Sequence, residues 1–232
     1  MKLKITIGVF VVVLLGLFLL ARVIHANGQA SNDYIKTEEA SLDENSEDSK
    51  SPSTIRKDYI ELHTESSEEI DSIFEICKPA PLSSISELII KKKAYIVSYN
   101  KDTKIPNWVA WRLTGVHSDG PVGRSNSFYE DEEVPLPRAT SEDYRGSGWS
   151  RGHMCPAGDN KWSETAMYES FSLVNVCPQN ANLNSGLWNS IEIDCRRWAR
   201  HFGAVYIVCG PVFLNRKHET IGSNDLLVEL NL

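Results

Sequence analysis

The chain has 232 residues, which is enough for one well-packed domain and little more. Its formal net charge is −7, from 24 lysines and arginines against 31 aspartates and glutamates. This balance argues against a protein that binds polyanions through a strong overall positive charge. Any binding of a nucleic acid or another polyanion therefore depends on the local placement of basic side chains.

The N-terminus combines two lysines, Lys2 and Lys4, with an apolar run from Ile5 to Ala21. A cleaved signal peptide and an uncleaved signal anchor both fit residues 1–25, because the run is at the short limit for a membrane-spanning helix. Basic residues before such a run stay in the cytoplasm. We therefore expect an exported protein, either membrane-anchored with an extracytoplasmic domain or, after cleavage, secreted or periplasmic.

Residues 26–75 differ in composition from the rest of the chain. They hold four basic and fourteen acidic residues, many serines and few aromatic residues. Such a segment buries too little apolar surface to fold, so we expect a disordered acidic stalk. Residues 76–232 hold 17 basic and 17 acidic residues and are expected to form the folded domain.

The folded domain contains signals for strands and for one long helix. β-Branched and aromatic residues concentrate in four segments between Pro, Asn and Gly breaks, which predicts strands at 94–100, 108–114, 171–177 and 205–213. Leu187, Ile191, Trp198 and Phe202 recur at helical spacing and predict a helix from about 187 to 202 with these residues on its core face. The elements together predict an α+β fold with a mainly antiparallel sheet.

A polar stripe is expected beside this apolar face of the helix. Asn184, Trp188, Glu192 and Arg196 are spaced four apart, and residues at this spacing lie one above the other on a helix. The stripe would project an amide, a carboxylate and a guanidinium into one cleft. Asn184 also fits a helix N-cap, and Glu192 with Arg196 also fits an ordinary surface ion pair.

A histidine lies in the short motif Ser150-Arg151-Gly152-His153. Glycines before it and Pro156 after it predict a short extended element whose side chains face the same cleft. A neutral histidine is suited to activating a water molecule. Mg²⁺ keeps most of its waters in proteins, so the amide oxygen of Asn184 is enough as a direct protein ligand. These are the functional groups that a metal-dependent phosphodiesterase uses.

Two runs carry a resemblance to a known family. The run from Asp143 through His153 to Trp162, and the run Asn175-Val-Cys-Pro-Gln-Asn-Ala-Asn-Leu-Asn184, closely resemble the DNA/RNA non-specific endonucleases, which include mitochondrial endonuclease G and secreted bacterial nucleases. The resemblance implies a ββα-metal motif and a Mg²⁺ or Mn²⁺ cofactor. It also implies hydrolysis of DNA and RNA through contacts with the phosphate backbone, leaving 5′-phosphate and 3′-hydroxyl ends.

The same resemblance implies a role for each site residue. His153 matches the general base, Asn184 the direct metal ligand and Glu192 a carboxylate that contacts metal-bound water. Three arginines match residues near the phosphate or the charged transition state: Arg124, Arg151 and Arg196. Ser150 departs from the family, because most relatives have an aspartate there.

The resemblance covers about residues 90–230, and the family normally continues through further strands and a helix. We therefore expect a C-terminally shortened form of the fold. A rival interpretation, favoured by the shortening and by Ser150, is a non-catalytic exported module that binds nucleic acid. In this interpretation the N-terminal segment, if uncleaved, adds the membrane as a partner.

Five cysteines allow at most two disulfides. Export would permit such bonds. Cys155 and Cys177 flank the two runs that carry the resemblance, and they are the first candidate pair.

Overall fold

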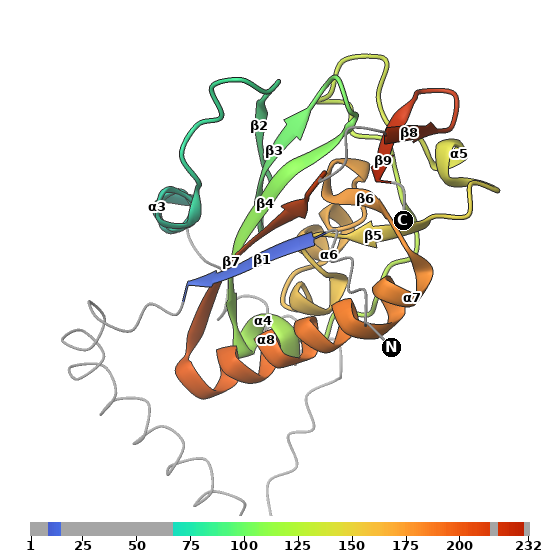
Figure 1. The fold of residues 1–232 in the computed structure, drawn as a ribbon. Coiled ribbons are helices and arrows are strands. Elements are labelled where there is room, and N and C mark those ends of the chain that lie inside the picture. Colours follow the sequence, from blue (N-terminus) through green and yellow to red (C-terminus); the bar gives the residue numbers. More distant parts are fainter. Residues whose placement is uncertain (1–8, 15–66, 214–217, 230–232) are drawn as a thin grey trace, which may run out of the picture.

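The central element of the fold is a five-stranded sheet (Figure 1). The structure, a computed structural model, describes residues 9–14, 67–213 and 218–229. The strands of this sheet follow the order β1 (Val9–Leu14), β7 (Ala204–Pro211), β4 (Ile105–Thr114), β3 (Ile96–Asn100) and β2 (Leu88–Lys91). Every neighbouring pair in the sheet is antiparallel.

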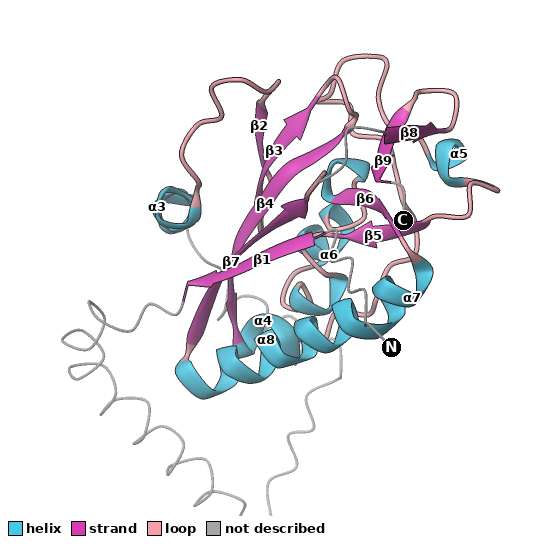
Figure 2. Cartoon of the chain, viewed as in Figure 1, coloured by secondary structure: helices cyan, strands magenta, loops and turns pink. Residues whose placement is uncertain are grey.

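Two short antiparallel pairs and several helices complete the fold (Figure 2). The pairs are β5 (Ser150–His153) with β6 (Val176–Gln179), and β8 (His218–Ile221) with β9 (Leu226–Glu229). The α-helices are α3 (Ser67–Cys77), α4 (Gly115–Asp119), α5 (Ser141–Tyr144), α6 (Glu164–Glu169), α7 (Ala181–Leu183) and α8 (Asn189–Phe202). Two 3₁₀ turns, Ala157–Asp159 and Leu173–Asn175, and a π-helical turn, Asn184–Trp188, join them. These elements confirm the predicted α+β fold with a mainly antiparallel sheet.

The sheet separates two apolar clusters, because side chains alternate between its faces. On β4, Trp108 and Ala110 pack with Phe74 of α3, whereas Val109 and Trp111 face the larger cluster. That larger cluster also contains Met154 and Cys155, which directly follow β5, and buried residues of β6 and α8. The predicted site elements therefore lie on one face of the sheet and α3 covers the other (Figure 1).

The segment predicted as a strand at 171–177 differs from the prediction over most of its length. Leu173–Asn175 form a 3₁₀ turn, and the strand begins only at Val176. The hydroxyl of Ser172 accepts a hydrogen bond from the amide of Val174, and the amide of Asn175 donates to the carbonyl of Ser172. These local bonds compete with strand pairing, and strand propensity does not reveal them.

The predicted core face of the long helix is also wrong. Leu187 and Phe202 are 52% and 49% exposed, whereas Trp188, Cys195 and Ala199 are buried. Cys195 and Ala199 are small, which lets α8 approach the sheet closely. The prediction gave most weight to large apolar side chains, so it placed the core face on the neighbouring stripe of the helix.

Part of the N-terminal apolar run is extended rather than helical. Val9–Leu14 form β1, whose partners are residues 206–211 of β7. Within the described ranges, no helix has the length and apolar character needed to cross a bilayer. Residues 67–75, expected to belong to the stalk, lie in α3, and the stalk residues 26–66 lie outside the described ranges.

All five cysteines are buried free thiols, so the predicted bond between Cys155 and Cys177 is absent. The sulfur of Cys177 lies 4.0 Å from the sulfur of Met154. The thiol of Cys155 instead accepts a hydrogen bond from the side-chain amide of Asn160. Burial raises the pKa of both thiols, which keeps them protonated.

The contact between β7 and β4 depends on Gly210. A Cβ atom at this position would lie 2.2 Å from the carbonyl oxygen of Asn107. We expect Gly210→Ala to lower the free energy of unfolding by about 1–3 kcal/mol, because the two strands must separate locally. The matched control is Gly123→Ala, since no atom lies within 4 Å of a Cβ placed there. Equal urea midpoints for the two variants would contradict this account.

Candidate active site

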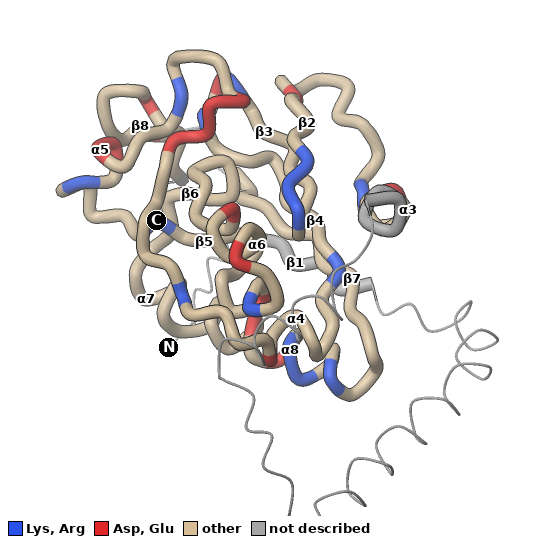
Figure 3. Tube along the Cα trace, turned by 180° about the vertical axis from the view of Figure 1, so that it is seen from behind, with Lys and Arg blue, Asp and Glu red and all other residues tan. Residues whose placement is uncertain are grey.

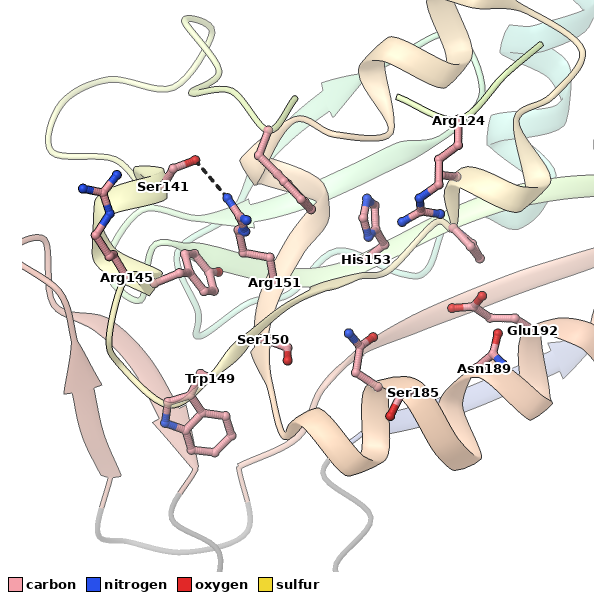
Figure 4. A pocket seen from close by; sticks show the side chains of 15 residues that line it. Arg124, Ser141, Arg145, Trp149, Ser150, Arg151, His153, Ser185, Asn189 and Glu192 are labelled. Atoms are coloured by element: carbon pink, nitrogen blue, oxygen red, sulfur yellow. Dashed lines mark hydrogen bonds between the residues drawn. The ribbon is translucent and has the colours of Figure 1, made fainter. Parts of the chain in front are cut away.

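A cavity of about 790 Å³ opens beside β5 (Figure 4). It is lined by Arg124, Phe128, Ser141, Tyr144, Arg145, Trp149, Ser150, Arg151, His153, Pro156, Ala157, Asn184, Ser185, Asn189 and Glu192. Five of the six predicted site residues line this cavity. The exception is Arg196.

The pairing of β5 with β6 brings these residues together. Ser150 lies opposite Gln179 and His153 opposite Val176, so the chain leaves β6 beside Ser150 and then enters the helical segment that carries Asn184. A Cβ atom at position 152 would lie 2.2 Å from the Oε1 atom of Gln179. Gly152 is therefore required for this close approach, which the sequence motif alone does not explain.

Asn184 occupies the first position of the π-helical turn and is the C-cap of α7, not the N-cap of a helix. The N-cap of α7 is Asn180, whose side chain accepts hydrogen bonds from the amides of Asn182 and Leu183. Gly186 has non-helical dihedrals and marks the kink between this turn and α8. Single π turns of this type occur frequently at functional sites.

His153 is buried and packs against two aromatic rings that also contact each other. It is 8% exposed, and its ring centroid lies 5.0 Å from that of Phe128 and 4.8 Å from that of Phe171. Its Nε2 atom is buried without a hydrogen-bond partner in the described part of the chain. Burial, followed by the charges of Arg124 and Arg151, lowers the pKa of His153 to about 3. The imidazole is therefore neutral at physiological pH.

The two arginines lie on either side of His153 (Figure 4). The guanidinium of Arg151 lies 4.2 Å from the ring centroid of Phe128, and Arg124 lies 5.3 Å from that of Phe171. Arg151 also donates a 3.5 Å hydrogen bond to Ser141. Cation–π contacts hold both guanidiniums over the rings that enclose the histidine. The cavity therefore presents two positive charges beside a neutral base.

Local placement of arginines matters here because the chain has no general excess of positive charge. Lys/Arg and Asp/Glu positions are interspersed along the trace seen from behind (Figure 3). An anion that enters the cavity is attracted by the guanidiniums of its lining rather than by the surface as a whole.

Asn184 and Glu192 line the cavity with an amide and a carboxylate side chain. The Asn184 side chain makes no hydrogen bond with another described residue. Burial and the neighbouring charge of Asp159 raise the pKa of Glu192 to about 7, although Arg196 and Arg124 oppose this shift. A bound cation would favour the ionised carboxylate, and an amide with a carboxylate suits a hard divalent cation. No group of three His, Cys, Asp or Glu side chains suited to a metal occurs in the described ranges.

Arg196 lies behind the cavity wall instead of facing the cavity. Its Nη1 atom lies 2.8 Å from Asp159 and 3.7 Å from Glu192. Asp159 is fully buried and also accepts a 3.1 Å hydrogen bond from the indole of Trp111. Arg196 thus links the sheet to the helix that carries Glu192. The prediction that Arg196 shares a cleft with Asn184 failed because the buried charge of Asp159 attracts its guanidinium.

Several residues that shape the site were not predicted from sequence. Phe128 and Phe171 enclose His153, Asp159 holds Arg196, and the indole of Trp188 donates to the carbonyl of His153. Each contact joins residues that are 18 or more positions apart, so local spacing carries no signal for it.

The ion pair behind the cavity generates a stability prediction. We expect Arg196→Met to lower the free energy of unfolding by about 3 kcal/mol at neutral pH, because it leaves the Asp159 carboxylate buried without its partner. The matched control is Arg197→Met, whose ion pair with Asp194 is exposed and should contribute at most about 1 kcal/mol. Similar losses in the two variants, measured by urea unfolding, would contradict the structural role of Arg196.

The lowered pKa of His153 generates a pH prediction. Between its ordinary value of 6.5 and about 3, the unfolded chain binds a proton that the folded chain does not, so the stability of the folded state decreases as the pH falls. At pH 5 the contribution is about 2 kcal/mol. The loss of stability from pH 7 to pH 5 should therefore be about 2 kcal/mol larger for the parent than for His153→Gln. Parallel stability curves for the two proteins would show that His153 is not held neutral.

Comparison with known proteins places the chain in a family. A family model described as DNA/RNA non-specific endonuclease matches residues 74–228. The chain is 42% identical over 127 residues to the mitochondrial nuclease EXOG of Xenopus laevis, covering 54% of this chain and 36% of that protein. It is 38% identical over 150 residues to mitochondrial endonuclease G of Bos taurus, covering 59% of this chain and 50% of that protein. The chain therefore spans between about a third and a half of the length of these relatives.

The fold comparison agrees with the family match. A chain from the crystal structure of the EndoG/EndoGI complex superposes with a TM-score of 0.64 at 30% identity, covering 69% of each chain. The relatives named above are mitochondrial nucleases, which contradicts the expected export to a membrane-anchored, secreted or periplasmic location. The membrane as a partner has no support either. The chain belongs to the DNA/RNA non-specific endonuclease family.

Proposed function

We propose that the protein is a metal-dependent endonuclease that hydrolyses phosphodiester bonds of DNA and RNA without sequence specificity. The observation that carries this proposal is the cavity in which a buried, neutral His153 lies between two arginines and shares the lining with Asn184 and Glu192. Family membership supports the same reaction class.

In this proposal the arginines bind the phosphate and His153 acts as general base. Guanidinium groups bind phosphate oxygens in a bidentate manner. A phosphate bound at Arg124 and Arg151 would offset the charges that lower the pKa of His153. The basicity of the imidazole would therefore increase when the substrate is in place, and the imidazole would take the proton of the attacking water.

Asn184 and Glu192 are the residues that would hold Mg²⁺ or Mn²⁺. When bound, the cation supplies positive charge that stabilises the leaving oxygen. Arg196 is a positioning residue in this proposal, because it contacts Glu192 from behind the cavity wall. Ser150 lines the cavity where most relatives have an aspartate, and its hydroxyl adds hydrogen bonding without charge.

The lack of sequence specificity follows from the type of contact. Arginines that bind phosphate oxygens fix the position of a polynucleotide but carry no information about its bases. A base-independent site also accepts both DNA and RNA.

The test of the proposed function uses the full chain with supercoiled plasmid and with RNA. We expect both substrates to be cut with Mg²⁺ or Mn²⁺ present and neither to be cut with EDTA. Binding without cleavage under every metal condition would overturn the proposal and favour the non-catalytic nucleic-acid-binding module.

The role of His153 generates a kinetic prediction. We expect His153→Ala to lower the cleavage rate by about 100-fold or more, because general-base catalysis typically contributes that much. The matched control is His201→Ala on the exposed end of α8, which should cut at the parent rate. Parent-like cleavage by His153→Ala, with an unchanged circular dichroism spectrum, would remove His153 from the mechanism.

A further inference from the structure

The cavity extends beyond the groups that the proposed reaction uses. One end is lined by residues of α5 and the loop that leads to β5: Ser141, Tyr144, Arg145 and Trp149. Figure 4 shows Arg145 and Trp149 beyond Arg151 and Ser150, on the side of His153 that faces away from Arg124. This end of the cavity therefore lies next to the reaction centre, and the mechanism assigns no role to it.

The backbone of this loop is held in one conformation. Gly146 and Gly148 have φ angles of 67° and 82°, which glycine adopts without strain. Between them, Ser147 donates from its amide and its hydroxyl to the carbonyl of Tyr144, at 3.3 and 2.9 Å. The amide of Trp149 then donates to the hydroxyl of Ser147 at 3.1 Å. The backbone positions of Arg145 and Trp149 are therefore set before any ligand arrives.

A buried carboxylate fixes the loop to the rest of the domain. Asp143 accepts hydrogen bonds from the amide of Thr140 at 2.8 Å and from the amide of Asn224 at 3.0 Å. Asn224 belongs to the turn between β8 and β9. The loop is thus supported from behind by the β8–β9 hairpin, and preorganisation of this kind lowers the entropic cost of binding.

Two side chains at this end of the cavity, those of Trp149 and Arg145, differ in the contacts they can make. Trp149 is half-buried and packs against the main cluster, so part of its indole remains available in the cavity. Arg145 forms an ion pair with Glu142 in which the side chains are 78% and 64% exposed. Such an exposed pair is weak, so the guanidinium can exchange Glu142 for a phosphate at little cost.

Arg145 also extends the arginines of the cavity. Figure 4 shows Arg145, Arg151 and Arg124 one after another along the lining, with His153 between the last two. A series of positive charges with an aromatic ring beside it is the arrangement that binds single-stranded nucleic acid, because bases stack on the ring while phosphates contact the charges.

We propose that the α5–β5 end of the cavity is a subsite for one unpaired nucleotide next to the scissile phosphate. The Arg145 guanidinium binds a phosphate of this nucleotide, and the Trp149 indole stacks on its base. This inference rests on the proposed nuclease function. Stacking accepts any base, so the subsite adds affinity for the strand without adding sequence specificity.

The test compares cleavage patterns along end-labelled single strands that carry one abasic position. In the parent, the bond that places the missing base on Trp149 should be cut about tenfold more slowly than the other bonds. Trp149→Leu keeps apolar bulk but loses the flat ring, so it should cut that bond as fast as the other bonds. Trp149→Phe keeps a flat ring, so cleavage at that bond should stay slower than at the other bonds. If removing the Trp149 ring and removing the base have non-additive effects on the cleavage rate, the non-additive part measures the contact between this side chain and the base.

The contribution of Arg145 is tested in the same way with one neutral methylphosphonate linkage. The parent should cut a bond near this linkage more slowly than the other bonds, and Arg145→Ala should not show this difference in rate. Two variants outside the cavity serve as matched controls: Trp198→Ala, a partly exposed tryptophan of α8, and Arg197→Ala, whose ion pair also spans three residues. Both should keep the parent pattern.

The outcomes separate the subsite from the proposed function. Even cleavage by the parent across the abasic position, or a dip that persists in Trp149→Leu, would overturn the subsite while leaving the nuclease function intact. A parent that cuts no strand at all would refute the nuclease function and the subsite with it.

Discussion

The close pairing of β5 with β6 is the constraint on which the site depends. At Gly152 the two strands approach so closely that the side chain of Gln179 fills the place of a Cβ atom. This pairing sets His153 at the edge of the main cluster and directs the chain from Gln179 through α7 to Asn184. A larger residue at position 152 would separate the base from the groups that would hold a cation, and the cavity would no longer combine them.

Charge and burial act together on the residues of this cavity. The aromatic enclosure of His153 and the two arginines both disfavour the imidazolium form, so the base is neutral while the cavity still attracts anions. On the opposite wall, burial and Asp159 disfavour the carboxylate form of Glu192, and Arg196 offsets part of this effect. In the proposed function, an anionic substrate would offset the charges of Arg124 and Arg151, and a bound cation would favour the carboxylate form of Glu192.

The sequence predicted the local parts of this arrangement better than its long-range parts. The motif around His153 predicted a short extended element, and β5 confirms it. Spacing by four also placed Asn184 and Glu192 in the same cavity, although a π turn lies between them and Trp188 of the same stripe is buried under β5. The position of Arg196 was not predictable, because its partner Asp159 is 37 residues away. The buried face of α8 was missed because its close contact with the sheet depends on small residues rather than on large apolar ones.

The central claim is that a water molecule, rather than a group of the substrate, attacks phosphorus in the cavity that contains His153. Cleavage of DNA and RNA in ¹⁸O-enriched water, with mass spectrometry of the products, tests this claim most directly. The account predicts one ¹⁸O atom in the 5′-phosphate of each newly formed end, for DNA and RNA alike. Unlabelled 2′,3′-cyclic phosphates from RNA together with uncut DNA would contradict it, because the nucleophile would then be the 2′-hydroxyl of the substrate rather than water.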